Sequence, residues 1–283
     1  MFGKLLKYEF KNTGKVLLPA FGLGIGGALI LNLFHWILSR FSMRIGEITN
    51  ELFRSLVGLY ALCVIVFSVG YAVVRFYRTM VGSEAYLTLT LPVNSTLHIW
   101  AKYLSGLCYS LLAVLASIVT SWAYDFRTIS FGIWEFSGEN GNLQRLTGSQ
   151  WLSVNGFLLC SAIVFAAFIL MEFFFCCAVG SQFKNKVVAS VVTYFIAHNA
   201  VGVITIMLLI PVAVGFDDQL ISWLENTESW FGQLMQGDAG SILNGVMGYL
   251  WVGLLIAAAY MAIWFIGYFL ASRYFLTKKV NLD

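Results

Sequence analysis

Six long apolar runs limit what this chain can fold into. They cover residues 16–38, 56–74, 103–124, 154–180, 187–214 and 242–271. About 20 residues of helix suffice to cross the hydrocarbon core of a bilayer, so each run is long enough to span it. A spanning segment must satisfy its own backbone hydrogen bonds, and at this length that predicts a helix. The sequence therefore predicts an all-α integral membrane protein with six transmembrane helices, in which residues 1–283 form a single transmembrane domain.

The composition agrees with that fold class. Charged residues make up 11% of the chain, whereas soluble domains carry about 25%, and the mean hydropathy is +0.81. A net charge of +3 is too small to indicate a nucleic-acid partner. The five cysteines lie inside apolar runs without C-x-x-C or His-Cys spacing, so we predict no metal site.

The distribution of basic residues predicts the orientation. If six helices cross the membrane, twelve of the 17 lysines and arginines fall on the side that holds both termini. The positive-inside rule then places both termini in the cytoplasm of a multi-pass membrane protein. These twelve residues are Lys4, Lys7, Lys11, Lys15, Arg75, Arg78, Lys102, Lys184, Lys186, Arg273, Lys278 and Lys279.

Residues 1–15 predict a separate amphipathic helix before the first span. One narrow arc of this helix holds Lys4, Lys7, Lys11 and Lys15. Apolar side chains occupy the opposite side, which is the pattern of a helix lying in the membrane interface. Glu9 falls on the apolar side. It is either a snorkelling or frayed position, or it forms an ion pair with a basic group of another segment.

The stretch 75–102 is a long connector between the second and third spans. Gly82, Ser83 and Glu84 can start a short helix, with Ser83 as its N-cap and the Glu84 carboxylate near the positive helix end. Pro92 would end it. The apolar side chains within it include Tyr86, Leu87 and Leu89. We expect a cytoplasmic segment that contacts a partner protein; the alternative is an interfacial linker.

At these residues the chain resembles a known family. The pattern R-x-x-x-G-x-E-x-Y-L-T-L-T-L-P-V, from Arg78 to Val93, resembles the first cytoplasmic loop of ABC-2-type permease subunits of bacterial ABC exporters. The opening KLLKYEFK, with Lys4, Lys7, Glu9 and Lys11, resembles the N-terminal interfacial elbow helix of the same family.

The resemblance implies a fold and partners. A cytoplasmic coupling helix between helices 2 and 3 would dock a separate ABC ATPase subunit. Its contacts would be Gly82, Ser83, Glu84, Tyr86, Leu87, Leu89 and Pro92. The resemblance also implies a second permease copy or a sister permease, and an extracellular re-entrant segment between helices 5 and 6. It implies the cytoplasmic membrane of a bacterium, and the chain looks most like small Gram-positive permeases for export of, or immunity to, peptide toxins or lantibiotics.

The ATP would be bound elsewhere. The chain has no G-x-x-x-x-G-K-[ST] phosphate-binding loop. We therefore expect a transport subunit that is not an enzyme and carries no cofactor, with ATP and Mg on the partner ATPase. The cargo would be an amphipathic peptide or a hydrophobic compound.

Three polar residues inside the apolar runs are candidates for a translocation path: Glu172 in the fourth run, and His198 and Asn199 in the fifth. Intramembrane charges usually face a protein interior or a wet cavity. Glu172 would line the path, form an ion pair at the cytoplasmic gate, or make a structural hydrogen bond to a neighbouring helix. His198 and Asn199 would line a pathway or bond across the dimer interface as a structural contact. Two other functions fit the sequence: an ion-coupled transporter that uses Glu172 and His198, and a membrane anchor or sensor that transports nothing.

Overall fold

The computed structural model describes residues 2–40, 43–82, 84–85, 95–124, 135–137, 143–145, 148–215 and 239–278. Within these residues, six helices are long and apolar enough to cross a membrane, so the predicted all-α, six-span class is confirmed. Two three-residue strands, β1 (Glu135–Ser137) and β2 (Leu143–Arg145), form a short antiparallel pair between the third and fourth of these helices.

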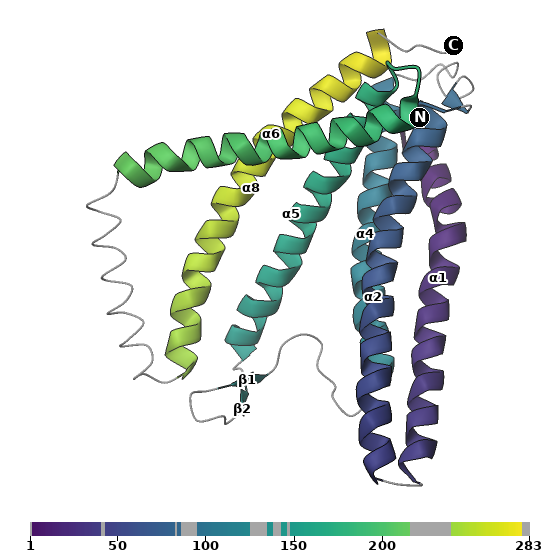
Figure 1. Cartoon of the computed structure of the whole chain (residues 1–283), viewed down its shortest axis with the longest axis vertical. Helices are drawn as coiled ribbons and strands as arrows, with labels where there is room; N and C mark the ends of the chain where they lie inside the picture. The colour runs from purple at the N-terminus through teal and green to yellow at the C-terminus, as the bar shows by residue number, and fades with distance from the viewer. Residues whose placement is uncertain are drawn as a thin grey trace.

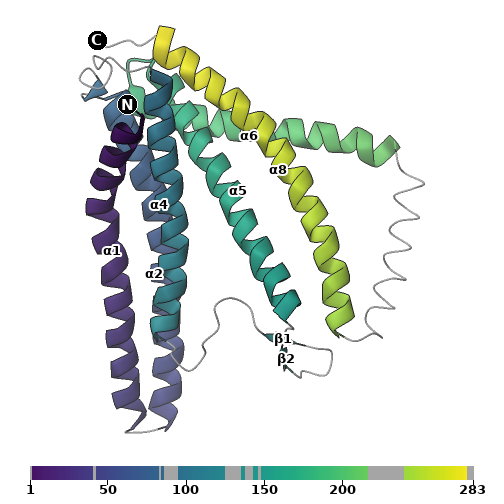
Figure 2. The ribbon, with the colours of Figure 1, turned by 180° about the vertical axis from the view of Figure 1, so that it is seen from behind.

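Three helices form a bundle in the first half of the chain. They are α1 (Phe2–Ser39), α2 (Met43–Met80) and α4 (Ser95–Tyr124), and they run side by side in Figures 1 and 2. Leu17 and Phe21 of α1 pack with Val64 of α2 and Tyr109 of α4. The Tyr109 hydroxyl also donates a hydrogen bond to the Phe10 carbonyl over 2.9 Å. Apolar packing and interhelical hydrogen bonds therefore hold the same three helices together.

The second half is more open. It consists of α5 (Gly148–Gly180), α6 (Lys186–Gly215) and α8 (Ala239–Lys278). In Figures 1 and 2, α6 lies across the long direction of the first three helices, although its sequence is as apolar as theirs. In the most apolar stretch of α6, no residue is buried by the described part of the chain. In the corresponding stretches of α4 and α5, 39% of the residues are buried. The apolar surface of α6 is thus left uncovered by the described residues.

One aromatic core joins the two halves. Phe76 of α2 stacks on Phe174 of α5 with ring centroids 3.9 Å apart, and both side chains are fully buried. Tyr103 of α4 and Leu276 of α8 complete the same cluster. This core lies at the end of the molecule where α1 begins and α8 ends (Figure 1).

The structure corrects the predicted boundary at residue 15. α1 is continuous from Phe2 to Ser39, so residues 2–15 do not form a separate elbow helix. The helix continues through the boundary although Pro19 lies inside it, and Thr13, Gly14 and Leu17 on either side of the boundary are all buried. One buried face therefore continues from Thr13 and Gly14 to Leu17, which favours one helix over two.

The connector between the second and third spans is shorter than predicted. α2 continues through Met80 and α4 begins at Ser95, so Arg75 and Lys102 lie on helices. The predicted ends of the two helices were placed where the apolar residues end. A helix can continue past that point when its polar side chains find partners, and both helices do so here. The predicted coupling residues Ser83, Tyr86, Leu87, Leu89 and Pro92 lie outside the described residues, as does most of the predicted re-entrant segment between α6 and α8.

Candidate functional site

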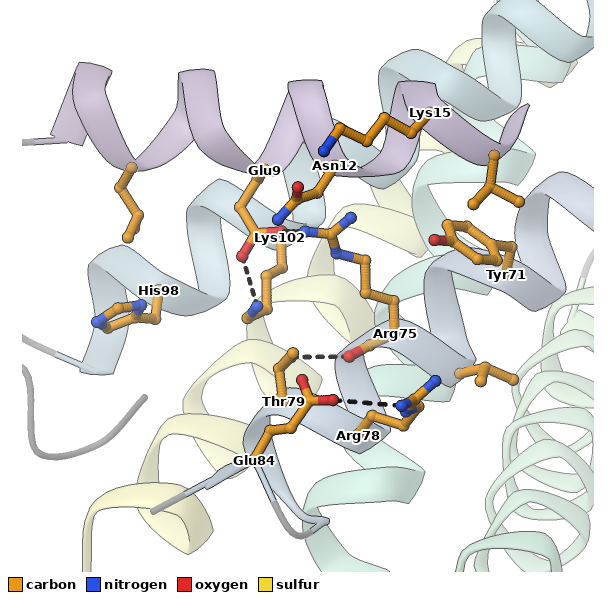
Figure 3. Close-up of a pocket in the computed structure, with 13 residues that line it drawn as sticks. Glu9, Asn12, Lys15, Tyr71, Arg75, Arg78, Thr79, Glu84, His98 and Lys102 are labelled. Atoms are coloured by element: carbon orange, nitrogen blue, oxygen red, sulfur yellow. Dashed lines mark hydrogen bonds and ion pairs between the residues drawn. The ribbon is translucent and has the colours of Figure 1, made fainter. Parts of the chain in front are cut away.

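Glu9 of α1 binds the end of α2 and the start of α4 at once (Figure 3). Its Oε2 lies 2.7 Å from Nη2 of Arg75, and its Oε1 lies 2.6 Å from Nζ of Lys102. Arg75 also donates a hydrogen bond from Nη1 to Oγ1 of Thr13 over 3.0 Å. We call Glu9, Thr13, Arg75 and Lys102 the Glu9 cluster. It links three helices through one carboxylate.

The sequence brings these residues together through the antiparallel arrangement of α2 and α4. Arg75 lies in the last turns of α2, and Lys102 lies in the first turns of α4. Because consecutive antiparallel helices place the end of one beside the start of the next, both cations reach the same level. Glu9 meets them because it lies on the side of α1 that faces the bundle, which is why it falls among apolar residues in the sequence.

Burial makes the pairing important. The side chains of Arg75, Glu9 and Lys102 are 16%, 12% and 5% exposed. Charges removed from water to this extent are costly unless they are paired. Of the two alternatives for Glu9, the structure has the ion pair with another segment. Its partners Arg75 and Lys102 were not predicted as site residues. The sequence did contain a signal, because Arg75 directly follows the second apolar run and Lys102 directly precedes the third.

A cavity of about 450 Å³ opens beside the Glu9 cluster, between α1, α2 and α4. Lys15, Arg78, Glu84 and His98 also line it (Figure 3). Nη2 of Arg78 lies 3.3 Å from Oε1 of Glu84, and these side chains are 69% and 48% exposed. The cavity therefore has a buried charged floor and a solvated charged rim.

Two predicted coupling residues lie where the connector leaves α2. The amide of Gly82 donates a hydrogen bond to the Tyr77 carbonyl over 2.8 Å, and the Ala85 amide donates to the Gly82 carbonyl over 3.0 Å. A Cβ at Gly82 would lie only 3.0 Å from the Arg78 carbonyl oxygen, so a glycine suits this close turn. Glu84 follows it as an exposed residue.

The lysines of the predicted elbow helix have a different role from Glu9. Lys4, Lys7 and Lys11 are exposed on α1 and do not line the cavity. They form the outer basic face of the helix, while Glu9 faces inward.

A second polar contact joins α5 and α6. Glu172 is fully buried, and its Oε1 lies 3.4 Å from Nδ1 of His198. The His198 ring also stacks on Tyr194, with ring centroids 5.6 Å apart. Asn199 is exposed and donates a hydrogen bond to the Phe195 carbonyl of its own helix over 2.7 Å. The structure thus brings Glu172 and His198 together and leaves Asn199 apart from them.

Comparisons with known proteins give no match. No family model, no curated protein and no solved structure matches this chain. Within the described residues, no three His, Cys, Asp or Glu side chains are grouped so that they would hold a metal ion. The Glu9 cluster and the Glu172–His198 contact are therefore the features of the described structure that bear on function.

Proposed function

We propose that this chain is the permease subunit of an ATP-driven exporter, whose ATP is bound by a separate ATPase subunit. The Glu9 cluster is the observation that carries this proposal. It fixes both helices that flank the 81–94 connector to a third helix, through ion pairs of 2.7 and 2.6 Å. This is the arrangement that a connector needs if a force applied to it is to move the membrane helices.

The proposed mechanism depends on helices that move together as rigid bodies. A partner that displaces the connector moves the end of α2 and the start of α4. Because Arg75 and Lys102 share Glu9, α1 moves with them. The stacked pair of Phe76 and Phe174 then passes the movement to α5. Packed helices with few alternative arrangements shift as bodies rather than deform gradually, which allows a local displacement to open a path.

The remaining partners are part of the same proposal. The lysines on α1 favour a cytoplasmic location for this end of the bundle, in a bacterial cell membrane. The exposed apolar surface of α6 would face lipid and a second copy or sister permease. The cargo would be an amphipathic peptide or a hydrophobic compound, in keeping with the resemblance of the connector to small peptide-exporting permeases.

Reconstitution with an ATPase tests the proposal. The chain is co-expressed with the P-loop ATPase encoded nearest to its gene, and ATP hydrolysis by the purified complex is measured in lipid. We expect Glu84→Arg, or Leu87 and Leu89 replaced together by Asp, to abolish complex formation or stimulated hydrolysis. Glu51→Arg is the matched control, because Glu51 is an exposed carboxylate nearer the other end of α2. Normal assembly and hydrolysis in the connector variants would refute the coupling role.

The Glu172–His198 contact favours a second candidate, an ion-coupled transporter. A buried carboxylate facing a titratable ring is the arrangement from which proton relays in membranes are built. In this case uptake or efflux would depend on a pH gradient without any ATPase, and Glu172→Gln would abolish that dependence. Transport that requires ATP and is unaffected by Glu172→Gln would exclude it. Assembly without any movement of cargo would instead indicate an anchor or sensor module.

A further inference from the structure

The cavity beside the Glu9 cluster has an excess of positive charge. Four basic side chains and two carboxylates line it, which leaves two positive charges uncompensated. The basic residues are Lys15, Arg75, Arg78 and Lys102, and the acidic residues are Glu9 and Glu84. The internal ion pairs therefore do not neutralise this cavity.

Two of the residues that line the cavity also have buried nitrogen atoms without partners in the described residues. His98 is 2% exposed, and its Nε2 forms no hydrogen bond to any described residue. Nε of Arg75 is likewise buried without a partner in the described part of the chain. Lys102 has three N–H donors, and the ion pair with Glu9 is the contact that its Nζ makes here. The remaining N–H donors of Lys102 and the Nε–H of Arg75 are therefore unused donors on buried groups, which favour a ligand with several acceptor oxygens.

We propose that this cavity binds an anionic phosphate group, carried either by a lipid headgroup or by a small soluble phosphate. Arginine and lysine together suit phosphate, since the guanidinium donates along two directions and the ammonium acts as a compact charge. A volume of about 450 Å³ accommodates a phosphate with a glycerol-sized substituent.

The depth of the cavity fits a phosphate at the membrane surface. Lys15 directly precedes the apolar run of α1, and Arg75 directly follows the apolar run of α2. Both therefore lie where a spanning helix leaves the hydrocarbon, which is the level of the phosphate groups of lipids. Basic side chains close to an anionic membrane surface each favour binding of anionic lipid.

Substitution of Glu9 tests the proposal, because it should strengthen anion binding and not weaken it. Its carboxylate occupies donors of Arg75 and Lys102 that an anion would otherwise use. Glu9→Gln keeps the shape of the side chain but removes its negative charge. A phosphate site requires this variant to bind the anion about fivefold more tightly, whereas a merely structural cluster gives no reason for any increase.

The experiment uses the full chain in uncharged detergent, with three probes. These are dioctanoyl phosphatidylglycerol, dioctanoyl phosphatidylcholine and inorganic phosphate, and the bound fraction is measured by native mass spectrometry or calorimetry. We expect Lys15→Gln to weaken phosphatidylglycerol binding about fivefold. Lys11→Gln is the matched control, because Lys11 is an exposed lysine of the same helix that does not line the cavity.

The outcomes separate the two sources of phosphate. Binding of phosphatidylglycerol that inorganic phosphate does not displace, and that responds to Lys15→Gln, supports a lipid headgroup. Mutual displacement with the same response supports a small soluble phosphate. Equal binding of the two lipids, or equal effects of Lys15→Gln and Lys11→Gln, overturns the proposal, even if Glu9→Gln does not fold. ATP hydrolysis with a partner is a separate readout, so this site and the proposed permease function can fail independently.

Discussion

The two halves of the molecule hold their helices together in different ways. In the first half, tyrosine hydroxyls reach backbone carbonyls of neighbouring helices, as Tyr109 does to Phe10 and Tyr60 does to Ala20. The Glu9 cluster adds ion pairs to these bonds. In the second half, α6 makes few polar bonds to other helices in the described residues, namely Glu172 to His198 and Thr205 to Tyr260.

The difference matters because lipid tails are as apolar as leucine. Helices in a membrane are held by close packing and polar bonds rather than by exclusion from water. The first half therefore has polar bonds that connect all three of its helices. In the second half, the apolar stretch of α6 is not buried by the described residues, so these residues provide it with little close packing. Four substitutions test this contrast, taken here from the largest expected effect to the smallest.

Loss of the Glu9 carboxylate should weaken the first half most. Glu9→Gln leaves Arg75 and Lys102 buried with an uncharged partner, and we expect the free energy of unfolding to fall by about 3 kcal/mol. Arg78→Gln is the control, since the exposed pair of Arg78 and Glu84 should contribute less than about 1 kcal/mol. Denaturant titration in detergent micelles measures both. Equal effects would mean that burial of the cluster contributes nothing.

Removal of a ring from the shared core tests the junction of the two halves. Phe174→Ala leaves a void opposite Phe76, and the cavity alone should cost about 2 kcal/mol. Phe165→Ala, on the same helix but 53% exposed, should cost far less because lipid fills the space. Thermal unfolding followed by near-ultraviolet circular dichroism compares the two. A similar loss in both variants would show that the stacked pair does not join the halves.

The turn between α5 and α6 depends on a glycine. A Cβ at Gly180 would lie 2.8 Å from the Ser190 amide nitrogen and 2.9 Å from the Lys186 carbonyl oxygen, so backbone must move to admit it. We expect Gly180→Ala to destabilise the chain by about 1.5 kcal/mol. Gly202→Ala, with nothing near its Cβ, should instead stabilise α6 by about 0.5 kcal/mol. The same unfolding titration detects the opposite signs, and equal signs would contradict the close approach.

The polar contact of α6 should contribute least. Polar bonds between membrane helices average about 0.6 kcal/mol, and we expect His198→Ala to cost that much. Asn199→Ala should cost less, since Asn199 bonds only within its own helix in the described structure. A double-mutant cycle with Glu172→Gln isolates the pair. A coupling energy as large as that of the Glu9 cluster would remove the contrast between the halves.

Some of this architecture is predictable from the sequence, and the reasons are specific. Length and apolarity predicted six helices, because the bilayer requires both. The position of Glu9 on an apolar face predicted that it either snorkels or pairs. Its partners could not be predicted, since they depend on how far α2 and α4 extend beyond their apolar runs. The crossing direction of α6 was equally out of reach, because an evenly apolar helix contains no sign of the direction in which it packs.

The glycines of the first span give a similar lesson. Small residues permit close approach of helices in lipid, but of the four glycines at 22, 24, 26 and 27 only Gly24 is placed so that a Cβ would meet a neighbouring side chain, the ring of Tyr60. Gly22, Gly26 and Gly27 have open space around them. A small residue permits an approach, and the neighbouring side chain decides whether it occurs.

The continuity of α1 also has a mechanical consequence. With 38 residues, at 1.5 Å per residue, the helix is about 57 Å long. It is held by ion pairs near one end, at Glu9, and continues as one helix to Ser39 with Pro19 inside it. A tilt of about 5° at the gripped end would swing the far end through roughly 4 Å along an arm of some 45 Å. A separate elbow helix would lose that leverage at its joint, whereas one continuous helix would carry the tilt to its far end.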